Sequence, residues 1–180
     1  MRKLVVVFLV AVVALSAAVG VQAFATNHSH KVRTVQLSGY NETPALNSPG
    51  TGTFTASIDD QAQTISYKLT YSGLSSNVTQ AHIHFGNRFS AQGVSLFLCT
   101  NLGNGPAGTQ ACPATGGTVT GTLHPADVVG PTPQGIPAGA AGWPAIVKAI
   151  RAGVAYANVH TTNFPGGEVR AQLNTHGNDH

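Results

Sequence analysis

The chain has 180 residues and a net charge of +3, and only 8% of its residues are charged. Most of the basic excess lies at the start, because removing Arg2 and Lys3 leaves seven basic residues against six acidic ones. A charge this sparse and nearly balanced excludes the electrostatic surface that nucleic-acid binding requires.

The start of the chain has the composition of a secretory signal peptide. Two basic residues precede an apolar run over residues 4–15, and small residues follow as far as Ala23 and Ala25. A membrane anchor is the alternative, but the run is short for a span and no basic stop-transfer flank follows it. We therefore predict a signal peptide over residues 1–25, cleaved after Ala23 or Ala25, and an extracytoplasmic protein, secreted or periplasmic, with no membrane association after cleavage.

Beyond a polar leader over residues 26–31, short segments rich in Val, Thr, Ile, Tyr and Phe recur between turns that contain Gly, Pro, Asn or Asp. Apolar and polar residues alternate in these segments, as in strands with one buried face. The predicted strands are residues 32–37, 52–58, 64–71, 79–85, 94–99, 117–123, 154–160 and 168–173. Strands at this spacing indicate an all-β, antiparallel sandwich or barrel.

One segment departs from strand alternation. Residues 143–152 carry aliphatic side chains at helical spacing, with a proline in the first turn and Gly153 after the last. We predict a short helix that crosses one end of the β structure. We expect one domain over residues 32–174 and a flexible tail over residues 175–180.

Cys99 and Cys112 are the only two cysteines in the chain. An even pair in an exported protein predicts a disulfide, here closing a loop rich in Gly, Asn and Pro. The alternative is a thiolate that binds a metal or acts as a nucleophile, and it fits less well with an oxidising compartment.

Two histidines lie one residue apart in the predicted strand over residues 79–85. His82 and His84 flank Ile83, so a strand places both imidazoles on one face and Ile83 on the other. Such a pair is either a polar cluster bonded to backbone carbonyls or part of a metal site. Their spacing along a strand allows both nitrogens to reach one ion.

A third histidine, His160, occurs in a similar segment near the C-terminus, on the same strand face as Tyr156 and Asn158. If its strand lies beside the first, three imidazoles meet, and such a set suits copper or zinc with one position open. Glu168 and Arg170 follow across a turn, and either could approach His160 as a hydrogen-bonding partner or as a competing charge.

Two further histidines are weaker metal candidates. His124 precedes a proline where a predicted strand passes into a loop. His28 becomes the third residue of the mature chain if cleavage follows Ala25, and an amino-terminal amine, two amide nitrogens and this imidazole could bind Cu(II) in a square plane. Cleavage after Ala23 removes this second site.

Four segments together resemble the CHRD domain, the module named after chordin, which also occurs singly in exported bacterial proteins. The matching segments are residues 37–44, 81–84, 152–161 and 165–173. The most specific part is the closing motif Asn-Val-His-Thr…Pro-Gly-Gly-Glu-Val-Arg, and the resemblance spans residues 32–173. The chain departs from the family pattern at residues 43–45 and 85–86.

The resemblance implies an immunoglobulin-like Greek-key sandwich with remote similarity to copper/zinc superoxide dismutases. It implies no established enzymatic activity. In the dismutases, a His-x-His segment similar to residues 82–86 supplies two copper ligands. Dismutases also need a bridging histidine and further zinc ligands, but this chain has no histidine between Phe85 and Gly121, which argues against dismutase activity.

Residues and resemblance together predict an exported binding module that holds a copper or zinc ion through His82, His84 and His160. The alternative is a structural or protein-interaction sandwich without metal, which would bind another extracellular protein, as CHRD domains accompany growth-factor-binding modules in chordin. A dismutase-like redox enzyme is the least favoured of the three.

Overall fold

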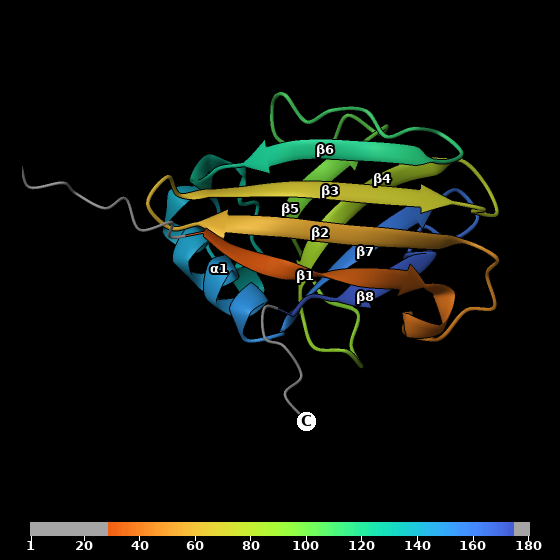
Figure 1. Ribbon diagram of the computed structural model, residues 1–180, viewed down its shortest axis with the longest axis horizontal. Helices are drawn as coiled ribbons and strands as arrows, with labels where there is room; N and C mark the ends of the chain where they lie inside the picture. The colour runs from red at the N-terminus through yellow and green to blue at the C-terminus, as the bar shows by residue number, and fades with distance from the viewer. Residues whose placement is uncertain (1–28, 175–180) are drawn as a thin grey trace, which may run out of the picture.

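The computed structural model describes residues 29–174, and this part of the chain forms eight strands and one α-helix (Figure 1). The strands are β1 (Ser29–Ser38), β2 (Thr51–Asp59), β3 (Thr64–Ser72), β4 (Val78–Phe85), β5 (Val94–Thr100), β6 (Gly117–Leu123), β7 (Ala155–Thr161) and β8 (Val169–Gln172). The helix is α1 (Trp143–Arg151), and short 3-10 turns lie at Gly39–Asn41, Pro125–Asp127, Thr132–Gln134 and Gly139–Gly142. The predicted signal peptide, His28 and the predicted tail lie outside the described residues.

All eight strands belong to one antiparallel sheet in the order β5-β4-β7-β8-β1-β2-β3-β6. The sheet is rolled so that β1, β2, β3 and β6 form one layer, and the other four strands cross behind it (Figure 1). The two layers join between β1 and β8 through the pair Ser38 and Arg170. The result is a flattened, nearly closed barrel, which confirms the predicted all-β sandwich or barrel.

The predicted element boundaries are close to those of the structure. The helix over residues 143–152 is confirmed as α1, and it covers one end of the barrel (Figure 1). The largest difference at a strand start is in β1, which begins at Ser29 and so adds residues 29–31 to the predicted strand over residues 32–37. They are part of the strand because the pairing of β1 with β2 continues to Ser29 and Asp59.

Within the described residues, no helix is long and apolar enough to cross a membrane.

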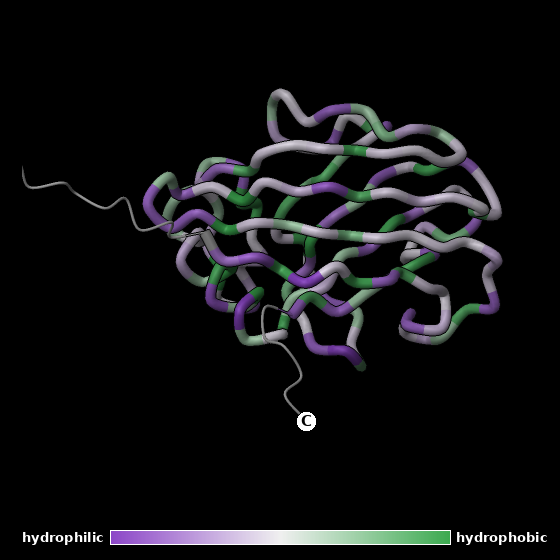
Figure 2. The backbone as a smooth tube through the Cα atoms, viewed as in Figure 1, coloured by the Kyte–Doolittle hydropathy of each residue, from purple (hydrophilic) through white to green (hydrophobic). Residues whose placement is uncertain are grey.

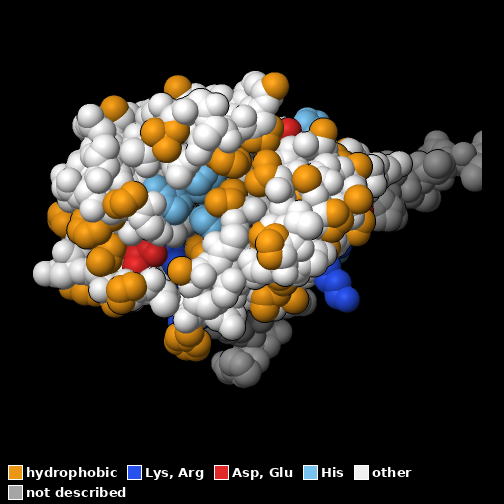
Figure 3. All heavy atoms as spheres, turned by 180° about the vertical axis from the view of Figure 1, so that it is seen from behind, with side chains coloured by type: hydrophobic (Ala, Val, Ile, Leu, Met, Phe, Trp, Pro, Cys, Tyr) orange, Lys and Arg blue, Asp and Glu red, His pale blue; other side chains and the backbone are white. Residues whose placement is uncertain are grey.

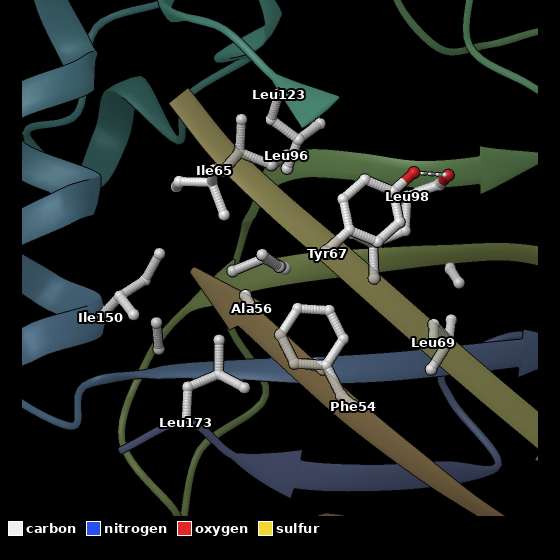
Figure 4. Close-up of a cluster of buried hydrophobic side chains, with 14 of the residues drawn as sticks. Phe54, Ala56, Ile65, Tyr67, Leu69, Leu96, Leu98, Leu123, Ile150 and Leu173 are labelled. Carbon is white, nitrogen blue, oxygen red and sulfur yellow. Dashed lines mark hydrogen bonds between the residues drawn. The ribbon is translucent and has the colours of Figure 1, made fainter. Parts of the chain in front are cut away.

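The hydrophobic core lies between the two layers. Short hydrophobic stretches alternate with paler or hydrophilic ones along the strands (Figure 2). Alternation puts every second residue of β2 and β3 inside, where Phe54, Tyr67 and Leu69 face Leu96 and Leu98 of β5 (Figure 4). The phenol of Tyr67 is satisfied within this core because it donates a hydrogen bond to the carbonyl of Leu98 at 2.6 Å.

A loop over residues 101–116 spans the seam between the edge strands β5 and β6. The predicted disulfide between Cys99 and Cys112 is confirmed and anchors this loop to β5. The side-chain amide of Gln110 donates to the Tyr67 hydroxyl and to the Thr120 carbonyl, both at 2.9 Å. The loop therefore connects the two sheet edges that the strands leave unpaired.

Replacing both cysteines with alanine is expected to lower the free energy of unfolding by about 3 kcal/mol, because the disulfide closes a loop with a sequence separation of 13. Urea denaturation of the wild-type and Cys99→Ala/Cys112→Ala proteins measures the difference. A loss below about 1 kcal/mol would contradict a stabilising role for this cross-link.

Strand β7 differs from the others because all seven of its residues are buried. Ala155, Ala157 and Val159 belong to the core, so Tyr156 and His160 point away from it. Connecting segments cover this outer face, and they create a buried polar layer on the outside of the sheet. The histidine cluster lies in that layer.

Candidate metal centre

The neighbouring strands β4 and β7 bring the three predicted histidines together. In their antiparallel register, His82 lies opposite Asn158, His84 opposite Tyr156, and Gln80 opposite His160. Ile83, between the two β4 histidines, is fully buried in the core, as the alternation predicts. The prediction that His82, His84 and His160 meet is confirmed.

The distances between the imidazole nitrogens match those around a single ion. His82 Nδ1 lies 3.1 Å from His160 Nε2, and His84 Nε2 lies 3.3 Å from the same atom. All three candidate ligand atoms lie within 4.8 Å of one another. Two nitrogens bound to a tetrahedral ion at about 2.0–2.1 Å stand about 3.3–3.4 Å apart, so the cluster has the dimensions of a metal site.

The cluster is buried yet open to solvent at its edge. The exposed fractions of His82, His84 and His160 are 1%, 5% and 5%. Figure 3 views the molecule from the side opposite to Figure 1 and shows histidine side chains at the bottom of a depression. An acidic and a basic side chain are visible beside them (Figure 3). An ion could therefore enter without unfolding of the sheet.

Two backbone carbonyls fix the tautomers of His84 and His160. The Nδ1 of His84 lies 2.9 Å from the carbonyl oxygen of Gln92, and the Nδ1 of His160 lies 2.9 Å from that of Pro165. A carbonyl only accepts hydrogen bonds, so both Nδ1 atoms carry protons. In the neutral rings, both Nε2 atoms then present lone pairs to each other, and this contact is favourable only with a cation between them.

A proton between the two Nε2 atoms is disfavoured, because the rings are buried. Burial, together with the neighbouring His160 and His84, lowers the pKa of His82 to about 2. Burial and His160 likewise lower the pKa of His84 to about 3, and burial lowers the pKa of His160. All three rings are therefore neutral at physiological pH, so a metal ion does not have to compete with an imidazolium charge.

Aromatic contacts hold the rings in position. The ring of His82 packs edge-on against Phe97 with a centroid distance of 4.4 Å. The ring of His84 stacks on Tyr156 at 4.7 Å, with the two planes 2° apart. His82 Nε2 is buried without a hydrogen-bond partner, and the Nδ1 of the same ring faces His160. The site is preorganised by packing as well as by hydrogen bonds.

Arg170, one of the two residues that could approach His160, lies against Tyr156. Its guanidinium carbon lies 3.4 Å above the ring of Tyr156, and it donates to the carbonyls of Ser90 and Asn87 at 3.0 and 2.7 Å. Arg170 thus holds the loop over residues 86–93 against the sheet. The carbonyl of Pro165 takes the position next to His160, because the turn before β8 folds back over β7.

Glu168 is also directed elsewhere. Its fully buried carboxylate accepts hydrogen bonds from the Ser48 hydroxyl, from the backbone and hydroxyl of Ser75, and from the Thr161 hydroxyl, at 2.6 to 3.0 Å. Burial alone would raise the pKa of Glu168, but these hydrogen bonds outweigh it and hold the pKa below its ordinary value. Glu168 therefore joins the segments that carry Ser48, Ser75 and Thr161, and its hydrogen bonds do not involve His160.

Glu42 belongs to this region although it was not among the predicted site residues. Its Oε1 and the Oδ1 of Asn158 are both buried without hydrogen-bond partners. Burial raises the pKa of Glu42 to about 7, against the smaller opposing effects of Arg170 and Asn158. The sequence signal that could have identified Glu42 was its place in the 37–44 segment of the family resemblance.

Replacing Glu42 with glutamine is expected to make stability less dependent on pH. The folded-state pKa of about 7 lies above the ordinary value of 4.5, so the wild type must bury an ionised carboxylate as pH rises. Its free energy of unfolding should fall by up to about 3 kcal/mol between about pH 4.5 and pH 8. Urea denaturation at both pH values measures this loss, and an equal loss in Glu42→Gln would contradict it.

His124 lies outside the cluster. It is exposed and caps the 3-10 turn Pro125–Asp127 just after β6, where its backbone N–H donates to the Asp127 carboxylate at 2.7 Å. The group of histidines that could share an ion comprises only His82, His84 and His160 within residues 29–174. A ligand role for His124 at this centre therefore has no geometric support.

A family model for the CHRD domain matches residues 33–173 of the chain. The match includes all three clustered histidines and nearly every described residue. A search of curated proteins found no match, and neither did a search of solved structures.

Proposed function

We propose that this chain, which belongs to the CHRD domain family, is an exported module that binds one copper or zinc ion through His82, His84 and His160. The observation that carries the proposal is the Nε2 contact of 3.3 Å between His84 and His160. Both rings direct their Nδ1 protons to carbonyls, so the facing nitrogens are free to bind a cation.

The donor chemistry supports copper or zinc in particular. Imidazole nitrogen suits both metals, whereas magnesium and calcium prefer oxygen ligands. The three rings would hold the ion, and a fourth position would remain for water or another ligand. Export is supported by the composition of residues 1–25 and by the disulfide, which is typical of oxidising compartments.

Metal content tests this proposal directly. We would strip the purified protein with a chelator, add Zn(II) or copper, remove excess ion by dialysis, and measure bound metal by mass spectrometry. We expect one ion per chain, with a dissociation constant below about 1 μM. The His28→Ala variant serves as the control, because it removes the candidate amino-terminal copper site. Absence of bound metal in this variant would contradict the proposal.

A protein-interaction role is the second candidate, and two exposed aromatic residues favour it. Tyr40 is 73% exposed, and Phe89 is 83% exposed. The loops that carry them are joined where the Thr43 hydroxyl donates to the Arg88 carbonyl at 3.5 Å. Exposed aromatic residues are enriched at protein interfaces. The two roles are compatible, because the loop that carries Phe89 also contributes Gln92 to the histidine cluster.

A further inference from the structure

The histidine cluster contains no anionic ligand. The three side chains that could share an ion are all imidazoles, and all are buried. The carboxylate of Glu168 is occupied by four hydrogen bonds from other residues. The carboxyl group of Glu42 interacts with Arg170 and is not among the side chains that could share the ion. A metal ion at this site would keep most of its own charge.

A buried positive charge lies behind the cluster. Arg170 is 2% exposed, and its guanidinium lies 3.4 Å from the ring centroid of Tyr156. The ring of His84 stacks on the same tyrosine ring, with a centroid distance of 4.7 Å. The position of Arg170 is fixed because it also donates to the carbonyls of Ser90 and Asn87. Its charge repels any cation that the histidines bind.

These charges act differently on monovalent and divalent ions. The cost of moving an ion from water into a buried site rises with the square of its charge, and its repulsion from Arg170 rises in direct proportion. The type of ligand does not determine which metal binds, because imidazole suits copper as well as zinc. Building on the metal site proposed above, we infer that His82, His84 and His160 select the monovalent cuprous ion, Cu(I), over Zn(II) and Cu(II).

Competition titrations test this selectivity. Cu(I) would be measured without oxygen, in ascorbate, against a cuprous chelator, and Zn(II) would be measured against a zinc chelator. The protein would carry His28→Ala to remove the amino-terminal candidate. We expect Cu(I) to bind at least about 100-fold more tightly than Zn(II). Equal or tighter Zn(II) binding would overturn the selectivity but leave the metal site intact, whereas binding of neither ion would overturn both.

Two variants of Arg170 test the electrostatic cause. Arg170→Gln removes the charge, and the gain in affinity should be about tenfold for Zn(II) but about threefold for Cu(I), because the repulsion scales with ion charge. Arg170→Lys keeps the charge but loses the planar stack on Tyr156, so it controls for packing. It should retain the wild-type ratio of the two affinities. The charge explanation fails if the glutamine variant leaves this ratio unchanged or if the lysine variant changes it equally.

Discussion

Replacement of His160 by alanine is expected to weaken metal binding by at least about 100-fold. His160 Nε2 is the atom that both other imidazoles approach, at 3.1 and 3.3 Å, so its removal leaves two ligands without the third. Isothermal titration with the metal ion measures the change. Circular dichroism and urea denaturation would establish that the variant keeps the wild-type fold.

His124→Ala is the matched control for this experiment. It makes the same chemical change at an exposed histidine outside the cluster, so its metal affinity should equal that of the wild type. If His160→Ala kept its affinity within about threefold, or if His124→Ala lost as much, the ion would not bind at the three-histidine cluster.

Replacement of Glu168 by alanine should lower the free energy of unfolding by about 4 kcal/mol. The carboxylate is fully buried and accepts four hydrogen bonds, which connect Ser48, Ser75 and Thr161. Hydrogen bonds to a charged group contribute about 1.5–3 kcal/mol each, but water entering the space would replace part of this. Urea denaturation at neutral pH measures the loss.

The same variant has a predicted pH signature. The pKa of Glu168 is lowered in the folded state, so its stabilising contribution is complete above the ordinary value of 4.5 and declines as pH falls below it. The stability difference between wild type and Glu168→Ala should therefore shrink at about pH 3. A difference that did not depend on pH would show that packing, and not the ionised carboxylate, is responsible.

A carboxylate whose hydrogen bonds are exposed to solvent provides the comparison. Asp59 accepts hydrogen bonds from the backbone N–H groups of Gln61 and Ala62, both at 2.9 Å, in a solvent-exposed turn. Asp59→Ala should cost no more than about 1 kcal/mol, because water replaces the lost acceptor. A similar loss in the two variants would mean that burial of Glu168 adds nothing to its effect.

Local properties of the sequence were enough to predict most of the fold. The alternation in residues 64–71 reflects the two-residue period of a strand, and the aliphatic spacing in residues 143–152 reflects the helical period. Both periods can be recognised from residues that are close together in the sequence. The juxtaposition of His82 and His160 is a long-range property, and the resemblance to the CHRD domain, not periodicity, indicated that these residues belong together.

Other features of the centre had no sequence signal. Gln92 and Pro165 contribute through backbone carbonyls, which every residue possesses, so their side chains gave no indication. Burial of the outer face of β7 depends on loops that fold over it, and alternation alone predicts an exposed face there. The position of Arg170 depends on the ring of Tyr156 and on the carbonyls of the 86–93 loop, and its place in the sequence after the turn did not indicate these contacts.

Anomalous diffraction from crystals of the metal-loaded protein, recorded at the absorption edge of the ion, is the most direct test of the proposed centre. We expect one strong peak about 2.0–2.1 Å from a ring nitrogen of each of His82, His84 and His160. A peak only at His124 or at the amino terminus, or no peak in fully loaded crystals, would contradict a metal centre formed by these three histidines.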